Sequence, residues 1–221
     1  MFANIERLLV KYGMNFVNGL GTTLLLALIS VLIGCVIGAF VAIMRLSKSK
    51  ILKGIAAVYT EVIRDTPLLL QLYFFYFLLP DILPALKLSK FTCIAVALTI
   101  NSGAYMAEIF RSGIQSIDRG QTEAARSLGL SSAQTMTRII LPQAFKNVLP
   151  AMCNEFVAIT KETSLASTFY VGDLMTQYQT ISGKTYLVLE PLIIIGIIYF
   201  VVTFTMSKLV AVLEKKLKEG D

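Results

Sequence analysis

Long uncharged apolar stretches recur along the chain. No Asp, Glu, Lys or Arg occurs between Lys11 and Arg45, and comparable stretches follow further on. A helix needs about 20 apolar residues to cross a hydrocarbon core of about 30 Å. The pattern predicts an all-α polytopic membrane protein of a single domain (1–221), with spans near residues 20–44, 54–79, 91–112, 148–170 and 187–209.

The second and fourth predicted spans differ from the others because charged residues interrupt them. Ionisable residues at bilayer depth cost free energy and usually face a cavity or a partner. Pro67 also lies in the second span, where a missing N–H and a steric clash predict a bend. The interrupting residues are Glu61, Arg64 and Asp65 in the second span, and Glu155, Lys161 and Glu162 in the fourth.

Composition and charge agree with a membrane protein. Hydrophobic residues make up 56% of the chain and charged residues 15%, against about 45–50% and 25% in soluble domains. The net charge of +6 does not indicate nucleic-acid binding, because the basic residues lie between apolar segments. Thirteen of the 20 basic residues lie in 45–53, 111–146 and 208–221. This bias predicts that those segments are cytoplasmic and that the N-terminus lies outside.

The sequence offers no catalytic or metal site. Histidine is absent, and Cys35, Cys93 and Cys153 lie singly in apolar stretches without the spacing of metal ligands or a disulfide framework. No Gly-x4-Gly-Lys-Ser/Thr motif occurs, so any ATP hydrolysis would need a separate chain. The N-terminus also lacks the features of a cleaved signal peptide, and we expect the first span to be retained.

The longest cytoplasmic loop has the signals of two short helices within residues 118–142. A surface hairpin that only connects two spans is the alternative interpretation. The signals are a capping box of Asp118 with Gln121, a left-handed stop at Gly129, an N-cap at Ser131 or Ser132, and Pro142 as the limit of the second helix.

This loop resembles the EAA loop of bacterial ABC importer permeases. The matching pattern is Glu123-Ala124-Ala125, then Gly129, then Ile139-x-Leu141-Pro142. The resemblance implies a coupling helix that docks into a groove on an ATPase subunit. The residues expected to mediate this coupling are Glu123, Ala124, Ala125, Arg126 and Gly129.

The rest of the chain resembles the permeases of polar amino acid importers, the group with the histidine, glutamine and arginine systems. One departure is Asp65, where these permeases usually carry glycine. The resemblance implies that an external binding protein delivers the solute and that two permease subunits form the pathway. The second permease is an identical or a homologous chain, with the identical one preferred. The similar segments are residues 19–23, 64–68, 104–111, 154–156 and 161–165.

Helical spacing places the polar residues of the spans in groups. Asn101, Tyr105 and Glu108 share one face of the third span, and Glu155 and Glu162 share one of the fourth. The structural alternative is that Arg64 pairs with Glu61 or Glu108, and that Asp65 only neutralises a neighbouring cation. We predict a shared substrate-binding cavity that contains Arg64, Asp65, Thr66, Asn101, Glu155, Lys161 and Ser164.

The combined interpretation is the transmembrane subunit of an ATP-driven importer in the bacterial inner membrane. We expect a polar and basic amino acid as solute, namely arginine, lysine or histidine. ATP and Mg would bind to the partner ATPase, so this chain needs no cofactor of its own. Membrane lipid is a further expected partner and nucleic acid is not. The alternatives are a secondary transporter or channel subunit, which leaves the EAA-like spacing unexplained, and a non-transporting scaffold.

Overall fold

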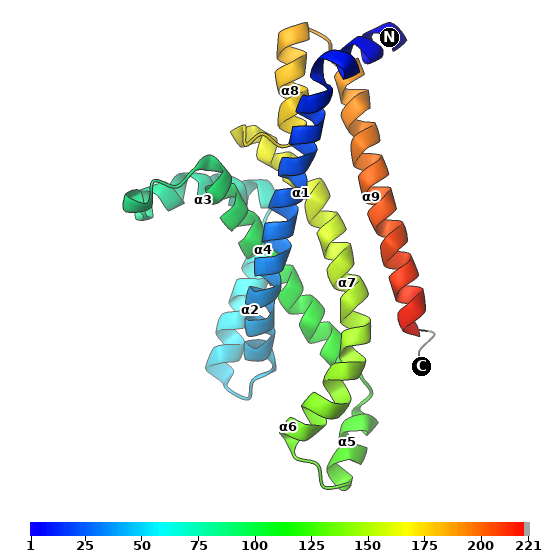
Figure 1. Cartoon of the computed structure of the whole chain (residues 1–221). Helices are drawn as coiled ribbons and strands as arrows, with labels where there is room; N and C mark the ends of the chain where they lie inside the picture. Colours follow the sequence, from blue (N-terminus) through cyan, green and yellow to red (C-terminus); the bar gives the residue numbers. More distant parts are fainter. Residues whose placement is uncertain (219–221) are drawn as a thin grey trace.

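The computed structural model describes residues 1–218, and the regular structure of these residues is helical throughout, as predicted. The long helices form an elongated bundle, from which α3 projects sideways and α5 and α6 extend at one end (Figure 1). The helices are α1 (Phe2–Leu46), α2 (Lys50–Arg64), α3 (Leu68–Ile82), α4 (Lys90–Gln115), α5 (Arg119–Ser127), α6 (Ser132–Thr135), α7 (Leu141–Glu162), α8 (Leu174–Thr185) and α9 (Leu189–Lys218). Short helical turns complete the chain: η1 (Pro84–Leu86), η2 (Met136–Ile140) and η3 (Thr163–Phe169).

The predicted spans correspond to helices of the bundle. Within residues 1–218, three helices are long and apolar enough to cross a membrane, namely α1, α4 and α9. Taken together as one broken span, α2 and α3 are also long and apolar enough to cross a membrane. The fourth predicted span corresponds to α7, whose polar residues lower its mean hydropathy below that of the other spans. This helix packs against α1, α4 and α9.

The first helix is longer than predicted, because it begins at Phe2 rather than near residue 20. Its additional turns bury Leu8 and Phe16 against Leu174 and Ile181 of α8. The segment between the fourth and fifth predicted spans is thus largely a helix, α8, which packs against the start of α1. Burial of these apolar side chains explains why both segments are ordered as helices.

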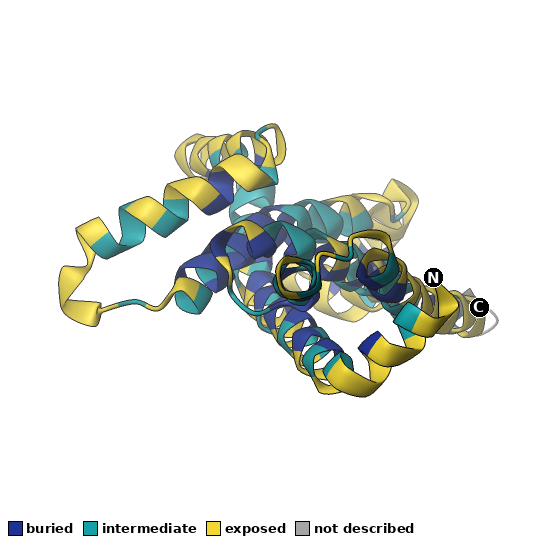
Figure 2. Ribbon diagram, turned by 90° about the horizontal axis from the view of Figure 1, so that it is seen from above, coloured by how far each residue is buried: buried dark blue, intermediate teal, exposed yellow. Residues whose placement is uncertain are grey.

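The helices α1 and α4 approach each other closely at small residues. A Cβ atom added to Gly38 would lie 2.5 Å from Met106 Cβ, and one added to Gly34 would lie 2.9 Å from Ser102 Oγ. Such contacts leave no room for a side chain, as in the small-xxx-small packing of membrane helices. Glycine at these two positions therefore allows α1 and α4 to pack closely, and Figure 2 shows the buried centre of the bundle.

The predicted bend at Pro67 is also confirmed. Helix α2 ends at Arg64, α3 begins at Leu68, and the two helices are bent by 107°. Pro67 is the N-cap residue of α3. The break interrupts the intrahelical hydrogen bonds, so carbonyl groups near the end of α2 need other donors.

Gln71 supplies these donors. Its Nε2 donates to the carbonyl oxygen of Ile63 at 2.7 Å and to Thr66 Oγ1 at 2.8 Å. Its Oε1 accepts from Asn101 Nδ2 at 2.9 Å, which connects the break to α4. Only 6% of Gln71 is exposed. We refer to Gln71, Thr66, Asn101 and the Ile63 carbonyl as the Gln71 brace.

The loop between α4 and α7 contains the two predicted short helices. Gly129 has φ +85°, which confirms the left-handed turn after α5. Ser131 caps α6 in a capping box with Gln134. The predicted box of Asp118 with Gln121 is wrong, because the Asp118 side chain accepts from the Gly120 N–H instead.

The predicted limit at Pro142 is wrong as well. Helical structure continues from α6 through the π-helical turn η2 into α7, and Pro142 lies in the first turn of α7. A proline normally clashes with the carbonyl four residues earlier. The wider spacing of a π-helical turn changes this contact, so the helix passes the proline without ending.

The brace predicts a specific sensitivity at Gln71. Replacing Gln71 by Leu keeps the size of the side chain but leaves the Ile63 carbonyl and Asn101 Nδ2 without their partners. Each unsatisfied buried group costs about 1–3 kcal/mol. We expect the apparent melting temperature of the purified permease to fall by several degrees.

Gln179→Leu is the matched control. Gln179 is partly buried, and its Oε1 has no partner among the residues that the structure describes. Its replacement should therefore leave the melting temperature nearly unchanged. Equal effects of the two substitutions would contradict the brace.

Candidate functional site

Several charged side chains act electrostatically on Tyr105 of α4. The Arg64 guanidinium lies 5.5 Å from the centre of the Tyr105 ring, a cation–π contact. Asp65, Glu155 and Glu162 also interact electrostatically with Tyr105. We call these five residues the Tyr105 cluster. It unites the end of α2, the middle of α4 and the second half of α7.

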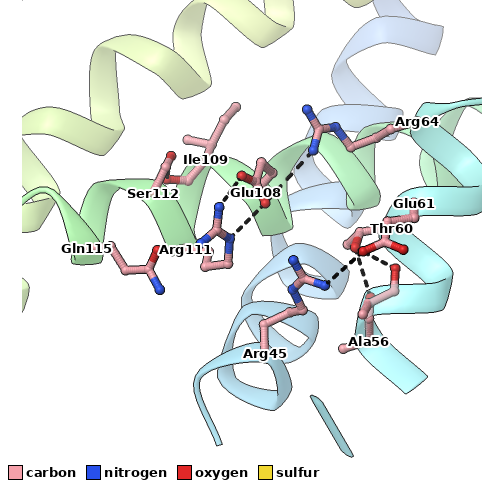
Figure 3. Close-up of polar contacts among 11 residues, drawn as sticks. Arg45, Ala56, Thr60, Glu61, Arg64, Glu108, Ile109, Arg111, Ser112 and Gln115 are labelled. Carbon is pink, nitrogen blue, oxygen red and sulfur yellow. Dashed lines mark hydrogen bonds and ion pairs between the residues drawn. The ribbon is translucent and has the colours of Figure 1, made fainter. Parts of the chain in front are cut away.

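The cation in this cluster is partly neutralised by an acid outside it. Arg64 Nη1 lies 3.9 Å from Glu108 Oε2, and Arg111 Nε donates to the same Glu108 oxygen at 2.9 Å. Glu61, one turn before Arg64 on α2, pairs instead with Arg45 of α1 at 3.7 Å (Figure 3). Of the two predicted partners of Arg64, the structure thus selects Glu108.

The acids of the cluster are less well compensated. Within the described part of the chain, Asp65 and Glu155 form no ion pair. Asp65 is exposed beside the helix break, and Glu155 is half-buried on α7. A site with an excess of carboxylates can bind an organic cation, because an unpaired charge in a low-dielectric region is costly.

The predicted substrate-binding residues fall into three groups in space. Arg64, Asp65 and Glu155 belong to the Tyr105 cluster. Thr66 and Asn101 belong to the Gln71 brace. The third group lines a separate pocket of about 390 Å³ that faces α8 and α9, and it consists of Lys161 and Ser164, with Met175, Leu192 and Tyr199.

The division follows from helical geometry. Neighbouring residues on a helix point about 100° apart, so Glu162 faces Tyr105 while Lys161 faces α9. The prediction missed Gln71 and did not include Tyr105 and Glu162 among the site residues. A lone glutamine in an apolar run four residues after Pro67 was the available signal for the brace.

The EAA-like loop lies at the far end of the molecule from the N-terminus (Figure 1). Glu123, Ala124, Arg126 and Gly129 are exposed, whereas Ala125 is buried. The Arg126 guanidinium donates to the Leu130 carbonyl and so closes the turn. Leu128 is 82% exposed at the corner, and the sequence prediction did not single it out.

Comparison with known proteins gives consistent matches over almost the whole chain. The family model of the binding-protein-dependent transport system inner membrane component matches residues 30–219. The arginine transport system permease protein ArtQ of Bacillus subtilis is 41% identical, over 92% of this chain and 93% of that protein. A putative glutamine transport system permease protein GlnP of Rickettsia bellii is 38% identical, over 91% and 92%.

A solved structure agrees with these relatives. The crystal structure of an amino acid ABC transporter with histidines contains a chain that is 46% identical and superimposes with a TM-score of 0.88. The match covers 94% of this chain and 96% of that one. A permease of this kind is a multi-pass inner-membrane component, and it implies an ATPase and a second permease as partners. The chain therefore belongs to the family of binding-protein-dependent inner membrane components, as a permease subunit of polar amino acid ABC importers.

Proposed function

We propose that this permease forms the pathway for amino acids with a cationic side chain, namely arginine, lysine or histidine. The observation that carries the proposal is the charge balance of the Tyr105 cluster. Asp65, Glu155 and Glu162 act electrostatically on one ring, while Arg64 pairs with Glu108 and Lys161 acts on Glu162. A guanidinium or ammonium group that enters between the acids would reduce this excess of negative charge.

The relatives support the same solute class. One is named as an arginine permease, and the solved transporter is described with histidines. Relatives named for glutamine transport support a neutral polar amino acid as the second candidate. The two candidates differ in whether Asp65 and Glu155 contribute to selectivity.

The other predicted residues act at different places. Arg64 would also meet the carboxylate of the solute, because Glu108, its ion-pair partner among residues 1–218, is shared with Arg111. Thr66 and Asn101 support the pathway through the Gln71 brace. Lys161 and Ser164 would contact solute only where the pathway passes the pocket beside α8 and α9.

Selectivity tests the solute proposal. Asp65→Asn and Glu155→Gln remove negative charge with little change of shape. A hydrogen bond to a charged group contributes about 1.5–3 kcal/mol, so uptake of arginine and lysine should fall about tenfold or more relative to glutamine. The measurement is competitive uptake into vesicles that contain the complete importer.

Asp81→Asn is the control for this test. Asp81 is an exposed acid on α3, outside the Tyr105 cluster. The Asp81→Asn substitution should leave the ratio of arginine to glutamine uptake unchanged. If neither cluster substitution changes this ratio, a neutral solute is favoured and the assignment as permease is unaffected.

The second part of the proposal concerns energy coupling. The loop around α5 would dock on a separate ATPase, where ATP and Mg bind. Ala124 is exposed and small enough for close contact, while Glu123 and Arg126 place charge beside it. Buried Ala125 holds α5 against the rest of the loop. A binding protein on the opposite side and a second permease, identical to this chain, complete the proposed importer.

Gly129 gives a sharp test of coupling. Its φ of +85° strains a leucine, although nothing lies within 4 Å of the added Cβ. Gly129→Leu should therefore reorient α5 and abolish ATP-driven uptake. Asn tolerates this backbone conformation, so Gly129→Asn should retain most uptake. Copurification with the ATPase is the second measurement, and full uptake by Gly129→Leu would refute the coupling role.

Orientation is testable by labelling. The distribution of basic residues places the loop of α5 and α6 in the cytoplasm and the end of α8 outside. In a background without the three native cysteines, an impermeant thiol reagent added to intact cells should label Tyr186→Cys. Tyr186 is 90% exposed. Exposed Ser132→Cys should react only after the membrane is opened, and the reverse pattern would invert the topology.

A further inference from the structure

An apolar groove of about 380 Å³ lies between α1, α4 and α7, at the end of the bundle next to α5 and α6. Its floor consists of small or buried side chains: Ala42, Ala144 and Val148 are 2%, 1% and 5% exposed. Its rim includes Ile43 and Phe145, which are 67% and 56% exposed. The groove thus opens on the surface of the bundle.

Close helix contacts hold the groove in shape. Gly38 allows α1 to pack closely against α4, because an added Cβ would lie 2.5 Å from Met106 Cβ. Gly113 allows α4 to pack closely against α7, because an added Cβ would lie 2.2 Å from Val148 Cγ2. The walls of the groove are therefore fixed by backbone packing, and the space between them does not need an occupant to form.

The charge beside the groove is positive. Leu46 ends the α1 wall, and the exposed residues Lys48 and Lys50 follow at once. Segment 45–53 contains four basic residues and no acid. Within this segment, Arg45 pairs with Glu61 of α2 at 3.7 Å. An apolar groove that ends at Leu46, close in the chain to two exposed lysines, is complementary to an acyl chain that carries an anionic headgroup.

We propose that this groove binds an anionic phospholipid, with an acyl chain on the alanine floor and the phosphate near Lys48 and Lys50. A protein occupant fits less well, because it would bury two lysines for which the groove offers no acid. Basic residues near a membrane surface attract anionic lipid. The site is distinct from the Tyr105 cluster and does not depend on which solute is carried.

Tryptophan fluorescence can test the site, because the chain contains no tryptophan. Phe145→Trp places a reporter on the rim, and Phe200→Trp places one on α9, where Phe200 is 63% exposed. The full-length permease is reconstituted in phosphatidylcholine vesicles with increasing brominated phosphatidylglycerol or brominated phosphatidylcholine. At residue 145, we expect brominated phosphatidylglycerol to reach half-maximal quenching at a mole fraction at least threefold lower than brominated phosphatidylcholine does. At residue 200, we expect the two lipids to quench at the same mole fraction.

A charge substitution separates a binding site from ordinary lipid contact. Lys48→Gln with Lys50→Gln, added to the Phe145→Trp chain, should reduce the preference to that seen at residue 200. Lys184→Gln, an exposed lysine on α8, should leave it intact. Equal quenching by both lipids, or a preference that survives loss of both lysines, would overturn the proposal. Absence of quenching by either lipid would show that protein covers the groove, and would overturn it too.

Discussion

A carbonyl group released by a helix break inside a membrane must find a donor within the protein, because lipid offers none. Pro67 creates such a break, and Gln71 satisfies the Ile63 carbonyl while it also bonds to Thr66 and Asn101. The bend of 107° is therefore stabilised by the first turn of the next helix. Gln71 thus connects the helix break to α4, beside an apolar cluster in which Leu72 of α3 packs with Ile94 and Leu98 of α4.

The Tyr105 cluster depends on this break. Since α2 ends at Arg64, the side chains of Arg64 and Asp65 lie at a helix terminus beside α4 rather than within a regular span. Arg64 then reaches both Tyr105 and Glu108. Burial of unpaired carboxylates is costly, so the acids from α7 are tolerable only where the interior is polar. The break between α2 and α3 supplies this polarity. The proline that bends the chain therefore also creates the polar surroundings of the Tyr105 cluster.

Features that depend on local chemistry could be predicted from the sequence. The bend at Pro67, the left-handed Gly129 and the close packing at Gly34 and Gly38 all follow from the properties of one residue type. Features that depend on how helices face one another could not. Lys161 was predicted to share one cavity with Arg64 and Asp65, and the structure places it in the lining of a pocket beside α8 and α9. The end expected at Pro142 failed because a π-helical turn, which no sequence signal announced, carries the helix past it.

Exposed apolar side chains have different meanings on the two kinds of surface in this protein. Those on α1, α3 and α9 lie on helices that lipid can solvate, so Phe74 on α3 needs no protein partner at 58% exposure. Leu128 stands on a polar loop beyond the spans and is 82% exposed. Water is its only alternative contact, and burying a leucine contributes about 1.5–3 kcal/mol. The exposure of Leu128 beside Glu123 and Arg126 is therefore the feature of this surface that most directly favours a docked partner on the EAA-like loop.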